Sequence, residues 1–445
     1  MKLLLAVHHF PPRYSAGAEL YTFRLARWLI AHGHQAEVVC IETLDEGRAA
    51  GVTAEPDQYE GVPVWRLHLG LRNAPANWSY ANPMVADWLA ERMRAARPDL
   101  LHLQSGYLIG AGVIEAAHAQ AIPSVVTLHD YWFLCPRITL LRGDGRVCTD
   151  IPSDPAGCAW CLQLDQRRHR LPEQISGGAM GRAWMALAGE TGREQQAMRR
   201  AYLQRVLGMA DLAIAPSQFL AGRFKALLQP ERLQTIRLGI DSSDLQETPQ
   251  PSANPETLRL AYLGQIAPHK GVHLIIQAMK LLSAHGKPVE LAIYGNPEQN
   301  PAYTRQLRSL IGTDPCITLA GRFAHSQLRS ILAHCDCTIV PSIWYENSPL
   351  TIMEAHAAGR PVITSRLGGM AELVRDGVDG LHFAPGDAAD LARQIQRLRD
   401  EPTLLGQLQA GVQVPASIER ELIELLAAYQ AVITRRELSP LPEAA

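Results

Sequence analysis

Short apolar runs of strand length alternate with amphipathic stretches through the first half of the chain. The apolar runs are residues 3–7, 36–41, 100–103 and 124–128. Between the first two, residues 19–32 carry a helical pattern that ends at Gly33, a residue that suits a helix C-terminal cap. Strands that alternate with helices are typical of a parallel sheet with helical crossovers. The pattern predicts a doubly wound α/β domain over residues 1–240.

The same alternation returns after a polar stretch rich in Pro, Ser and Glu. This stretch, residues 242–257, predicts a linker, placed at 241–257. The apolar runs beyond it are residues 258–263, 290–294, 337–340 and 362–365. They predict a second doubly wound domain over residues 258–416, with ligands in a cleft beyond the carboxyl ends of the strands. A last helical pattern, within residues 417–445, is expected to pack back on the first domain.

Length and composition agree with two globular domains. A chain of 445 residues exceeds one ordinary core, and its 47% hydrophobic and 19% charged residues describe a globular protein. A net charge of −2 gives no reason to expect nucleic acid as a partner. No apolar run approaches the roughly 18 residues that span a bilayer, and histidines and prolines at 8–12 interrupt the start before a signal sequence is complete. We therefore expect a cytoplasmic protein.

The stretch YENSPLTIME, residues 345–354, contains two carboxylates around a Ser-Pro pair. Ser348 is a good N-cap and Pro349 suits the first helical position, which predicts a helix from Pro349 to just before Gly359. Its first amides, on Leu350 and Thr351, would then present the positive end of the helix dipole to an anion such as phosphate.

The two carboxylates take separate places around this predicted anion site. Glu354 lies about one and a half turns inside the helix, where it could accept hydrogen bonds from sugar hydroxyls. Glu346 precedes the helix, so the two do not suit a simple acid/base pair. In the alternative interpretation Glu346 is a solvated loop charge and Glu354 an ordinary helix-surface residue.

Glu346, Glu354 and the following AHAAGRPVITSRLGGMAELVRDGVDGLHFAPGD resemble the donor site of retaining family-4 glycosyltransferases. Two further matches are LGQIAPHKGVHLIIQAM at residues 263–279 and FPPRYSAGAELYTFRLARWLIAHGHQAEVV at residues 10–39. The matches follow the family's order and span most of the chain. The resemblance implies a GT-B fold, in which two Rossmann-like domains face a central cleft that holds a nucleotide sugar.

The resemblance also implies roles for individual residues of the second domain. Glu354 matches the glutamate that binds the nucleotide ribose, and Glu346 the one that faces the transferred sugar near the reacting centre. Lys270 matches the lysine that neutralises the diphosphate, a charge that can stabilise the departing group without a metal ion. The loop and helix start whose backbone touches the diphosphate and sugar correspond to Asn347, Ser348, Pro349, Leu350 and Thr351.

Three further positions are matched or altered. Gln265 stands where many relatives carry an arginine that binds the diphosphate. Either Arg322 or another cation supplies this charge, or the leaving group is stabilised less. Gly17 retains the backbone freedom for close approach to phosphate. His129, at the end of a strand, matches a family histidine near the donor sugar, and we expect it to hydrogen-bond the sugar or the intermediate; a satisfied polar residue is the alternative.

The implied activity is sugar transfer from a UDP- or GDP-sugar to a hydroxyl acceptor with retained configuration, without a cofactor. A cell-surface polysaccharide, a lipopolysaccharide or a lipid-linked glycan precursor would be the acceptor. A GT-B epimerase and a non-catalytic glycan- or nucleotide-binding subunit are alternatives; a subunit could tolerate loss of Glu346 or His129, and both are present. An NAD-dependent enzyme is discounted, because the third glycine of the fingerprint that Gly110 would start is replaced by Glu115.

Four cysteines gather in a segment of poor helical or strand pattern at 135–161, predicted to be an insertion. They are Cys135, Cys148, Cys158 and Cys161. The closing Cys-x-x-Cys is a good metal half-site, and four thiolates predict a structural zinc with no open position for catalysis. Free thiols, a redox disulfide and an iron–sulfur site are the alternatives.

The segment from Arg137 to Arg205 carries eleven arginines against seven acidic residues, an excess of four. Such a run is usually a solvated face. The sharper hypothesis is attraction to a lipid-linked or otherwise anionic acceptor, with peripheral contact at the inner membrane surface.

Overall fold

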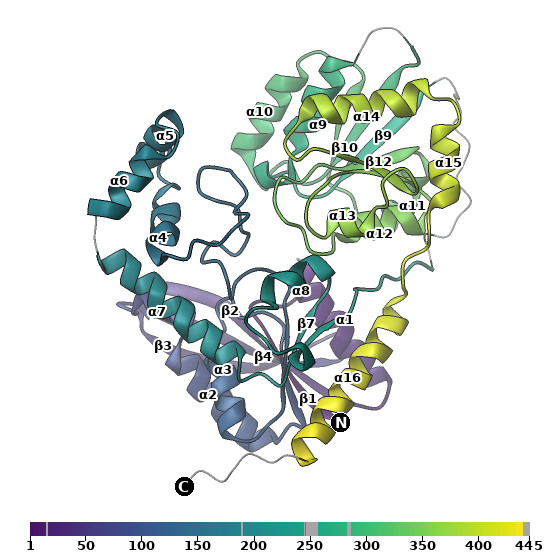
Figure 1. Ribbon diagram of the computed structural model, residues 1–445. Helices are drawn as coiled ribbons and strands as arrows, with labels where there is room; N and C mark the ends of the chain where they lie inside the picture. Colours follow the sequence, from purple (N-terminus) through teal and green to yellow (C-terminus); the bar gives the residue numbers. More distant parts are fainter. Residues whose placement is uncertain (15–16, 188–189, 244, 246–256, 283–285, 439–445) are drawn as a thin grey trace. The chain divides into compact units, whose positions relative to one another are not determined.

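The computed structural model describes residues 1–445 except 15–16, 188–189, 244, 246–256, 283–285 and 439–445 (Figure 1). The chain divides into two compact units. Unit 1 contains Met1–Pro216, Leu220–Ile236 and the chain from Leu422, and unit 2 contains Ser217–Phe219 and Arg237–Glu421. The chain passes from unit 1 to unit 2 at Arg237, and most of the predicted linker at 241–257 lies outside the described residues.

Unit 1 is built on an eight-stranded sheet of order β3-β4-β2-β1-β5-β6-β7-β8. All neighbouring strands are parallel except β3 and β4. The sequence analysis identified neither strand: β3 is largely exposed, whereas β4 is largely buried and its alternating apolar residues were overlooked. The alternating apolar runs of the first half are confirmed as strands. The strands are β1 (Lys2–Val7), β2 (Gln35–Ala49), β3 (Gly51–Tyr59), β4 (Val62–Arg72), β5 (Leu100–Leu103), β6 (Ser124–Thr127), β7 (Leu212–Ala215) and β8 (Leu233–Thr235).

Helices cover this sheet and extend beyond it into the segment 155–187. They are α1 (Gly17–Ala31), α2 (Pro83–Ala96), α3 (Gly112–Ala119), α4 (Pro155–Gln163), α5 (Arg167–Ile175), α6 (Ala179–Leu187), α7 (Glu190–Leu207) and α8 (Gln218–Phe224). The last helix, α16 (Ile418–Leu438), belongs to unit 1 from Leu422 onward. Its Tyr429 is buried, with its hydroxyl 2.5 Å from His102 Nδ1 on β5. No helix within the described residues combines the length and apolar character that crossing a bilayer requires.

Unit 2 has a six-stranded, wholly parallel sheet of order β11-β10-β9-β12-β13-β14. Its strands are β9 (Leu258–Leu263), β10 (Val289–Tyr294), β11 (Ile317–Gly321), β12 (Cys337–Val340), β13 (Val362–Ser365) and β14 (Gly380–Phe383). Its helices are α9 (Val272–Leu281), α10 (Pro301–Ile311), α11 (Leu328–Ala333), α12 (Leu350–Ala357), α13 (Met370–Leu373), α14 (Ala388–Asp400) and α15 (Leu404–Gly411).

Alternating residues of the central strand β9 enter two separate cores on the faces of this sheet. Leu260 and Tyr262 pack with residues of α9 and α14, whereas Ala261 and Leu263 pack with residues of α12 and α13. A strand buried on both faces is expected in a parallel sheet covered by helices. The prediction of two doubly wound α/β domains is confirmed.

Candidate active site

Strand β12 leads through the loop 341–349 into helix α12, the segment for which a helix start was predicted. The helix begins at Leu350, and Pro349 is the N-cap, with φ −65° and ψ 116° and no capping side chain. The prediction of Ser348 as N-cap and Pro349 as first helical residue was therefore wrong by one position. Since the first amides of a helix have no acceptor within it, those of Leu350 and Thr351 still mark its positive end.

Sheet order brings the loop before α12 to the loop that follows β9. Strands β9 and β12 are neighbours, with Leu260 opposite Cys337. The residues beyond their carboxyl ends therefore lie close together. One result is that the Ile343 amide donates to the His269 carbonyl at 2.9 Å. The other is that Lys270 Nζ donates to Glu346 Oε1 at 2.5 Å, although the two residues are 76 positions apart.

Glu346, the charged residue of this loop, is buried, with 7% of its surface exposed. Its Oε1 also accepts from Ser342 Oγ and from Trp344 Nε1, both at 2.8 Å. Burial alone would raise the pKa of Glu346, but the charge of Lys270 and these hydrogen bonds outweigh it and hold the pKa below its ordinary value. The structure thus joins Lys270 and Glu346 in one ionised pair.

Two glycines support the backbone that carries Glu346. The Gly369 amide donates to the Glu346 carbonyl at 2.7 Å, and a Cβ on Gly369 would lie 1.7 Å from the Asn347 carbonyl oxygen. Gly368, with φ +56°, would place a Cβ 3.0 Å from the Glu346 carbonyl oxygen. At both positions the backbone lies so close to the Glu346–Asn347 backbone that only glycine fits.

The predicted binding residues around this pair have distinct surroundings. Gln265 follows β9, and its carbonyl accepts from the buried Tyr262 hydroxyl at 2.6 Å. Arg322, named as a substitute cation, is exposed and paired with Glu298 at 2.9 Å. Asn347 is buried in the loop, and Glu354 lies half-buried in α12. The sequence analysis missed Ser342 and Trp344. Their signal was their position on the same loop, four and two residues before Glu346.

In unit 1, His129 lies at the end of a buried hydrogen-bond chain. His129 Nε2 lies 2.9 Å from Gln104 Oε1, and Gln104 Nε2 lies 3.0 Å from His102 Nδ1. His102 is held by the hydroxyls of Tyr429, at 2.5 Å, and Thr127, at 2.7 Å. The sequence analysis did not identify His102, Gln104 or Tyr429, because they are far apart along the chain.

The charge state of this chain follows from burial. Burial lowers the pKa of His129 to about 4 and that of His102 to about 3, so both imidazoles are neutral at neutral pH. Burial also raises the pKa of the adjacent Asp130 to about 6. A neutral His129 is suited to hydrogen-bond a sugar hydroxyl without adding charge.

Gly17 is the first residue of α1, and among the described residues outside its own helix no atom lies within 4 Å of where its Cβ would be. Two residues on, Glu19 pairs with His8 at 3.2 Å, and both interact electrostatically with His129. His8 and Glu19 therefore join Gly17 and His129 as candidate site residues that the motifs did not reveal.

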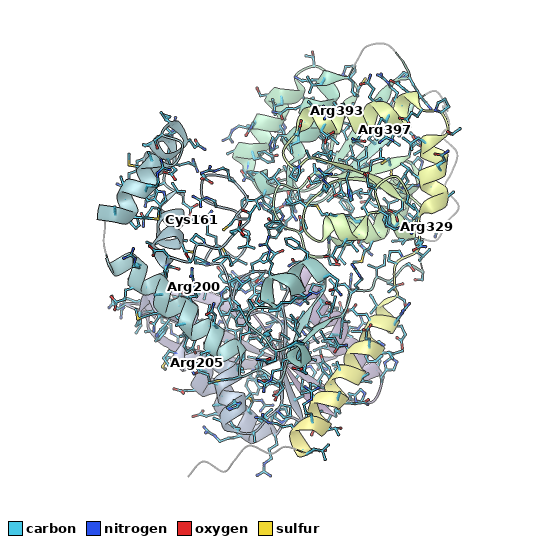
Figure 2. All side chains as sticks on the ribbon, in the orientation of Figure 1. Cys161, Arg200, Arg205, Arg329, Arg393 and Arg397 are labelled. Carbon is cyan, nitrogen blue, oxygen red and sulfur yellow. The ribbon has the colours of Figure 1, made fainter. Side chains whose placement is uncertain are left out.

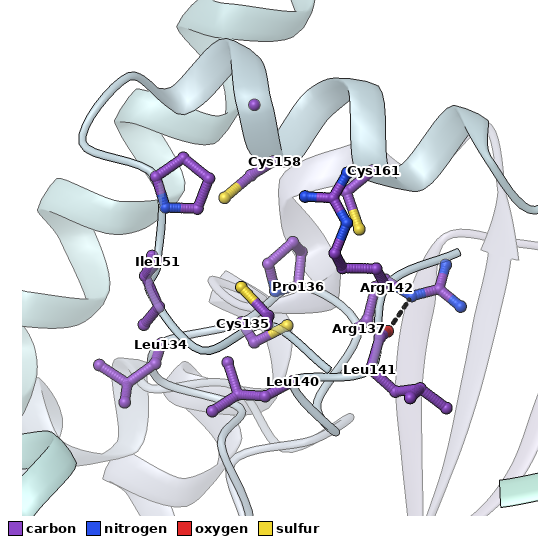
Figure 3. Close-up of a pocket in the computed structure, with 13 residues that line it drawn as sticks. Leu134, Cys135, Pro136, Arg137, Leu140, Leu141, Arg142, Ile151, Cys158 and Cys161 are labelled. Atoms are coloured by element: carbon purple, nitrogen blue, oxygen red, sulfur yellow. Dashed lines mark hydrogen bonds between the residues drawn. The ribbon is translucent and has the colours of Figure 1, made fainter. Parts of the chain in front are cut away.

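The four predicted zinc ligands also lie in unit 1, where all four cysteines line one pocket as free thiols (Figure 3). Within the described part of the chain, no three His, Cys, Asp or Glu side chains are grouped as ligands of one metal ion.

Comparisons with known proteins show the family of this chain. Residues 16–239 match the family model "Glycosyl transferase 4-like domain", and residues 257–401 match "Glycosyl transferases group 1". Glycogen synthase of Mycobacterium tuberculosis is 27% identical over 411 residues, which cover 90% of this chain and 87% of that protein. The lipopolysaccharide 1,2-N-acetylglucosaminetransferase of Salmonella typhimurium is 30% identical over 191 residues, 40% of this chain and 50% of that protein.

Solved structures with the same fold cover nearly the whole chain. Anabaena HepE in complex with UDP and glucose has a TM-score of 0.63 at 18% identity and covers 97% of this chain and 100% of its own. Sucrose-phosphate synthase from Thermosynechococcus elongatus has a TM-score of 0.65 at 18% identity, with 98% and 99% covered. The predicted GT-B fold is confirmed.

Proposed function

We propose, from the premise that the chain belongs to the glycosyl transferase 4-like family, that it transfers a sugar from a nucleotide sugar to an acceptor hydroxyl with retained configuration. That it is a glycosyltransferase follows from the family and its relatives. The observation that carries the residue assignment is the Lys270–Glu346 pair, whose buried Glu346 lies three residues before the N-cap of α12.

Each of these groups would act on a different part of the donor. The amides of Leu350 and Thr351 and the ammonium of Lys270 would stabilise the negative charge of the departing nucleoside diphosphate. Glu354 would accept hydrogen bonds from the ribose, and Glu346 would face the transferred sugar. Because Glu346 is ionised and holds Lys270, it also fixes where the ammonium can lie.

In the proposed mechanism the acceptor attacks on the face that the diphosphate leaves, and the diphosphate itself helps to remove the acceptor proton. Under this proposal neither glutamate is a nucleophile. His129, neutral at neutral pH, would hydrogen-bond the sugar. We take UDP-sugars as the first donors to test, since HepE was solved with UDP and UDP-glucose. The names of relatives, glycogen synthase and a lipopolysaccharide glycosyltransferase, support a polysaccharide or lipopolysaccharide as the acceptor, and a lipid-linked glycan precursor is the other acceptor to test.

Glu354→Gln should weaken donor binding by at least about tenfold, because a charged hydrogen-bond acceptor contributes roughly 1.5–3 kcal/mol. Calorimetry against UDP-, GDP- and ADP-sugars measures this and identifies the base. Glu401→Gln, an exposed glutamate paired with Arg397, is the control and should leave affinity unchanged. Unchanged affinity in Glu354→Gln would remove the ribose assignment.

Product analysis distinguishes the alternatives. A transferase releases nucleoside diphosphate in proportion to glycosylated acceptor, an epimerase converts the sugar while it stays on the nucleotide, and a binding subunit does neither. Either of the last two outcomes contradicts the proposed activity.

We further propose that a lipid-linked acceptor is reached by peripheral contact with an anionic membrane surface. Helix α5 carries Arg167, Arg168 and Arg170, and on the same segment Leu171 and Ile175 are exposed, Ile175 by 86%. Basic and apolar side chains together are typical of interfacial helices.

Vesicles containing phosphatidylserine should therefore bind the protein better than neutral vesicles, more so at low salt. Joint replacement of Arg167 and Arg168 by Glu should weaken binding to these vesicles by at least about 30-fold, since each lost arginine costs about 1 kcal/mol and the added glutamates repel the surface. The same replacement of Arg393 and Arg397, exposed on α14 (Figure 2), is the control. Equal binding to both vesicle types would disprove membrane contact.

A further inference from the structure

Three separate segments bring the four cysteines to one pocket of unit 1. Cys135 lies after β6, Cys148 follows a turn closed by the bridge between Leu141 and Val147, and α4 carries the other two. Figure 3 shows Cys135, Cys158 and Cys161 around this pocket. Positions i and i+3 of a helix share a face, so Cys158 and Cys161 can reach one ion.

Backbone amides point at two of the sulfur atoms. The amides of Arg137 and Leu140 hydrogen-bond the Cys135 sulfur, and the amide of Gly143 hydrogen-bonds the Cys161 sulfur. Gly143 can approach this closely because it lacks a Cβ, which would lie 2.7 Å from the Cys161 carbonyl oxygen. Burial is the larger effect and raises the pKa of Cys135 and of Cys161, and these donors oppose it without reversing it. In a metal site such donors orient the sulfur ligands.

Arginines surround the same four sulfurs. Arg200 Nη2 lies 3.6 Å from Cys158 Sγ, and Arg199, buried on α7, acts electrostatically on Cys135. Arg142 acts on Cys148 and Cys161. Figure 2 shows Cys161 on α4 and Arg200 on α7. Arg142 is also paired with Asp144. Four neutral thiols would not balance the positive charge of these arginines. Four thiolates around a divalent ion carry a net charge of −2, which would attract them.

Two helices beside the pocket bury few apolar side chains. Helix α5 buries Glu173 alone, and α4 buries Ala156, Ala159 and Trp160. Ile138 and Leu140 adopt φ of 68° and 52°, a left-handed conformation that costs energy for such side chains. Small segments without a sufficient core are commonly held by metal ions or disulfides.

We propose that Cys135, Cys148, Cys158 and Cys161 bind one Zn²⁺ as a closed, structural four-thiolate site. Soft ligands at four positions favour zinc and leave no open position for catalysis. Binding converts four thiols and one Zn²⁺ into four zinc–sulfur bonds and four protons released to water. The four cysteines line one pocket, but within the described residues their sulfur atoms are not close enough together to hold an ion. The cysteine side chains must therefore rotate toward one another when zinc binds. The site is independent of sugar transfer.

The full-length protein, purified without chelator and reduced, should hold about one equivalent of zinc by plasma mass spectrometry. X-ray absorption should show sulfur neighbours at about 2.3 Å. Cys158→Ser and Cys161→Ser should lower zinc content at least about tenfold, as loss of a ligand does. Cys316→Ser, outside the pocket, should retain the ion.

The wild-type protein provides a test that does not depend on variants that fold. Replacement of the ion by Co²⁺ should produce sulfur-to-metal charge-transfer bands and the d–d bands of tetrahedral cobalt. Less than about a tenth of an equivalent of zinc after reconstitution with Zn²⁺ would overturn the proposal. A disulfide between pocket cysteines that persists after the reduction step, or absorption typical of an iron–sulfur cluster, would also overturn it.

Discussion

Replacement of Lys270 by Ala should lower kcat/KM for sugar transfer by about 10²–10³-fold, the range found when one preorganised donor to a developing negative charge is removed. The Lys270 ammonium lies 2.5 Å from Glu346, whose carboxylate is further held by Ser342 and Trp344. The charge is therefore fixed before substrate binds and needs no reorganisation during transfer. Initial rates at varied donor concentration separate an effect on kcat from one on KM.

The same substitution should also destabilise unit 2, and the two effects must be separated. Without Lys270 the two strongest interactions that lower the pKa of Glu346 are lost while burial remains, so its pKa should rise. In the wild type this lowered pKa contributes stability above the pKa of the unfolded chain, and the contribution is lost as the pH falls. In Lys270→Ala it should be reduced at neutral pH, and urea unfolding measures the loss.

A matched control and a double substitution test the pairing itself. Lys280→Ala, an exposed lysine in the last turn of α9, should change neither rate nor stability. Glu346→Gln combined with Lys270→Ala should cost less stability than the sum of the two single substitutions, since the pair is lost only once. Full transferase activity in a folded Lys270→Ala protein would contradict the assigned role.

Gly369→Ala should lower the free energy of unfolding by about 3 kcal/mol or more, because overpacking against backbone cannot be relieved by rotation of a side chain. The added Cβ would lie 1.7 Å from the Asn347 carbonyl oxygen and 2.5 Å from its carbonyl carbon. The loop 345–347 must then move away, so the donor KM should rise as well. Urea unfolding and donor titration measure the two effects.

Gly406→Ala is the matched control within the same unit. Gly406 lies inside α15, and no atom lies within 4 Å of where its Cβ would be. Alanine in a helix interior should stabilise by about 0.5–1 kcal/mol. If both substitutions proved harmless, the loop around Gly369 could not be as closely packed as the structure shows.

The local pattern of the chain determined its main elements. Strands β1, β5, β9 and β13 were predicted from apolar runs, because the side chains of a buried strand are apolar and adjacent in sequence. Strand β3 was missed because it is an exposed edge strand without that signal, whereas β4, which lies inside the sheet, was missed although its apolar residues alternate. The helix start near Pro349 was displaced by one residue, a distinction that depends on a single backbone angle.

The family motifs likewise identified Lys270 and Glu346 as site residues but not their contact. That contact depends on β9 and β12 being neighbours in the sheet, an order that no local pattern records. The chain from Tyr429 through His102 and Gln104 to His129 depends in the same way on where α16 packs, 327 residues from its partner on β5.

The sequence by itself therefore determined the fold class and the family, and it predicted part of the candidate site. Only the tertiary structure decided which of them meet: which carboxylate holds Lys270, which glycine supports the loop, and which amides and arginines surround the four cysteines. The physical reason is that helices and strands follow from short-range periodicity, whereas side-chain contacts follow from strand order and register, which bring together residues far apart along the chain.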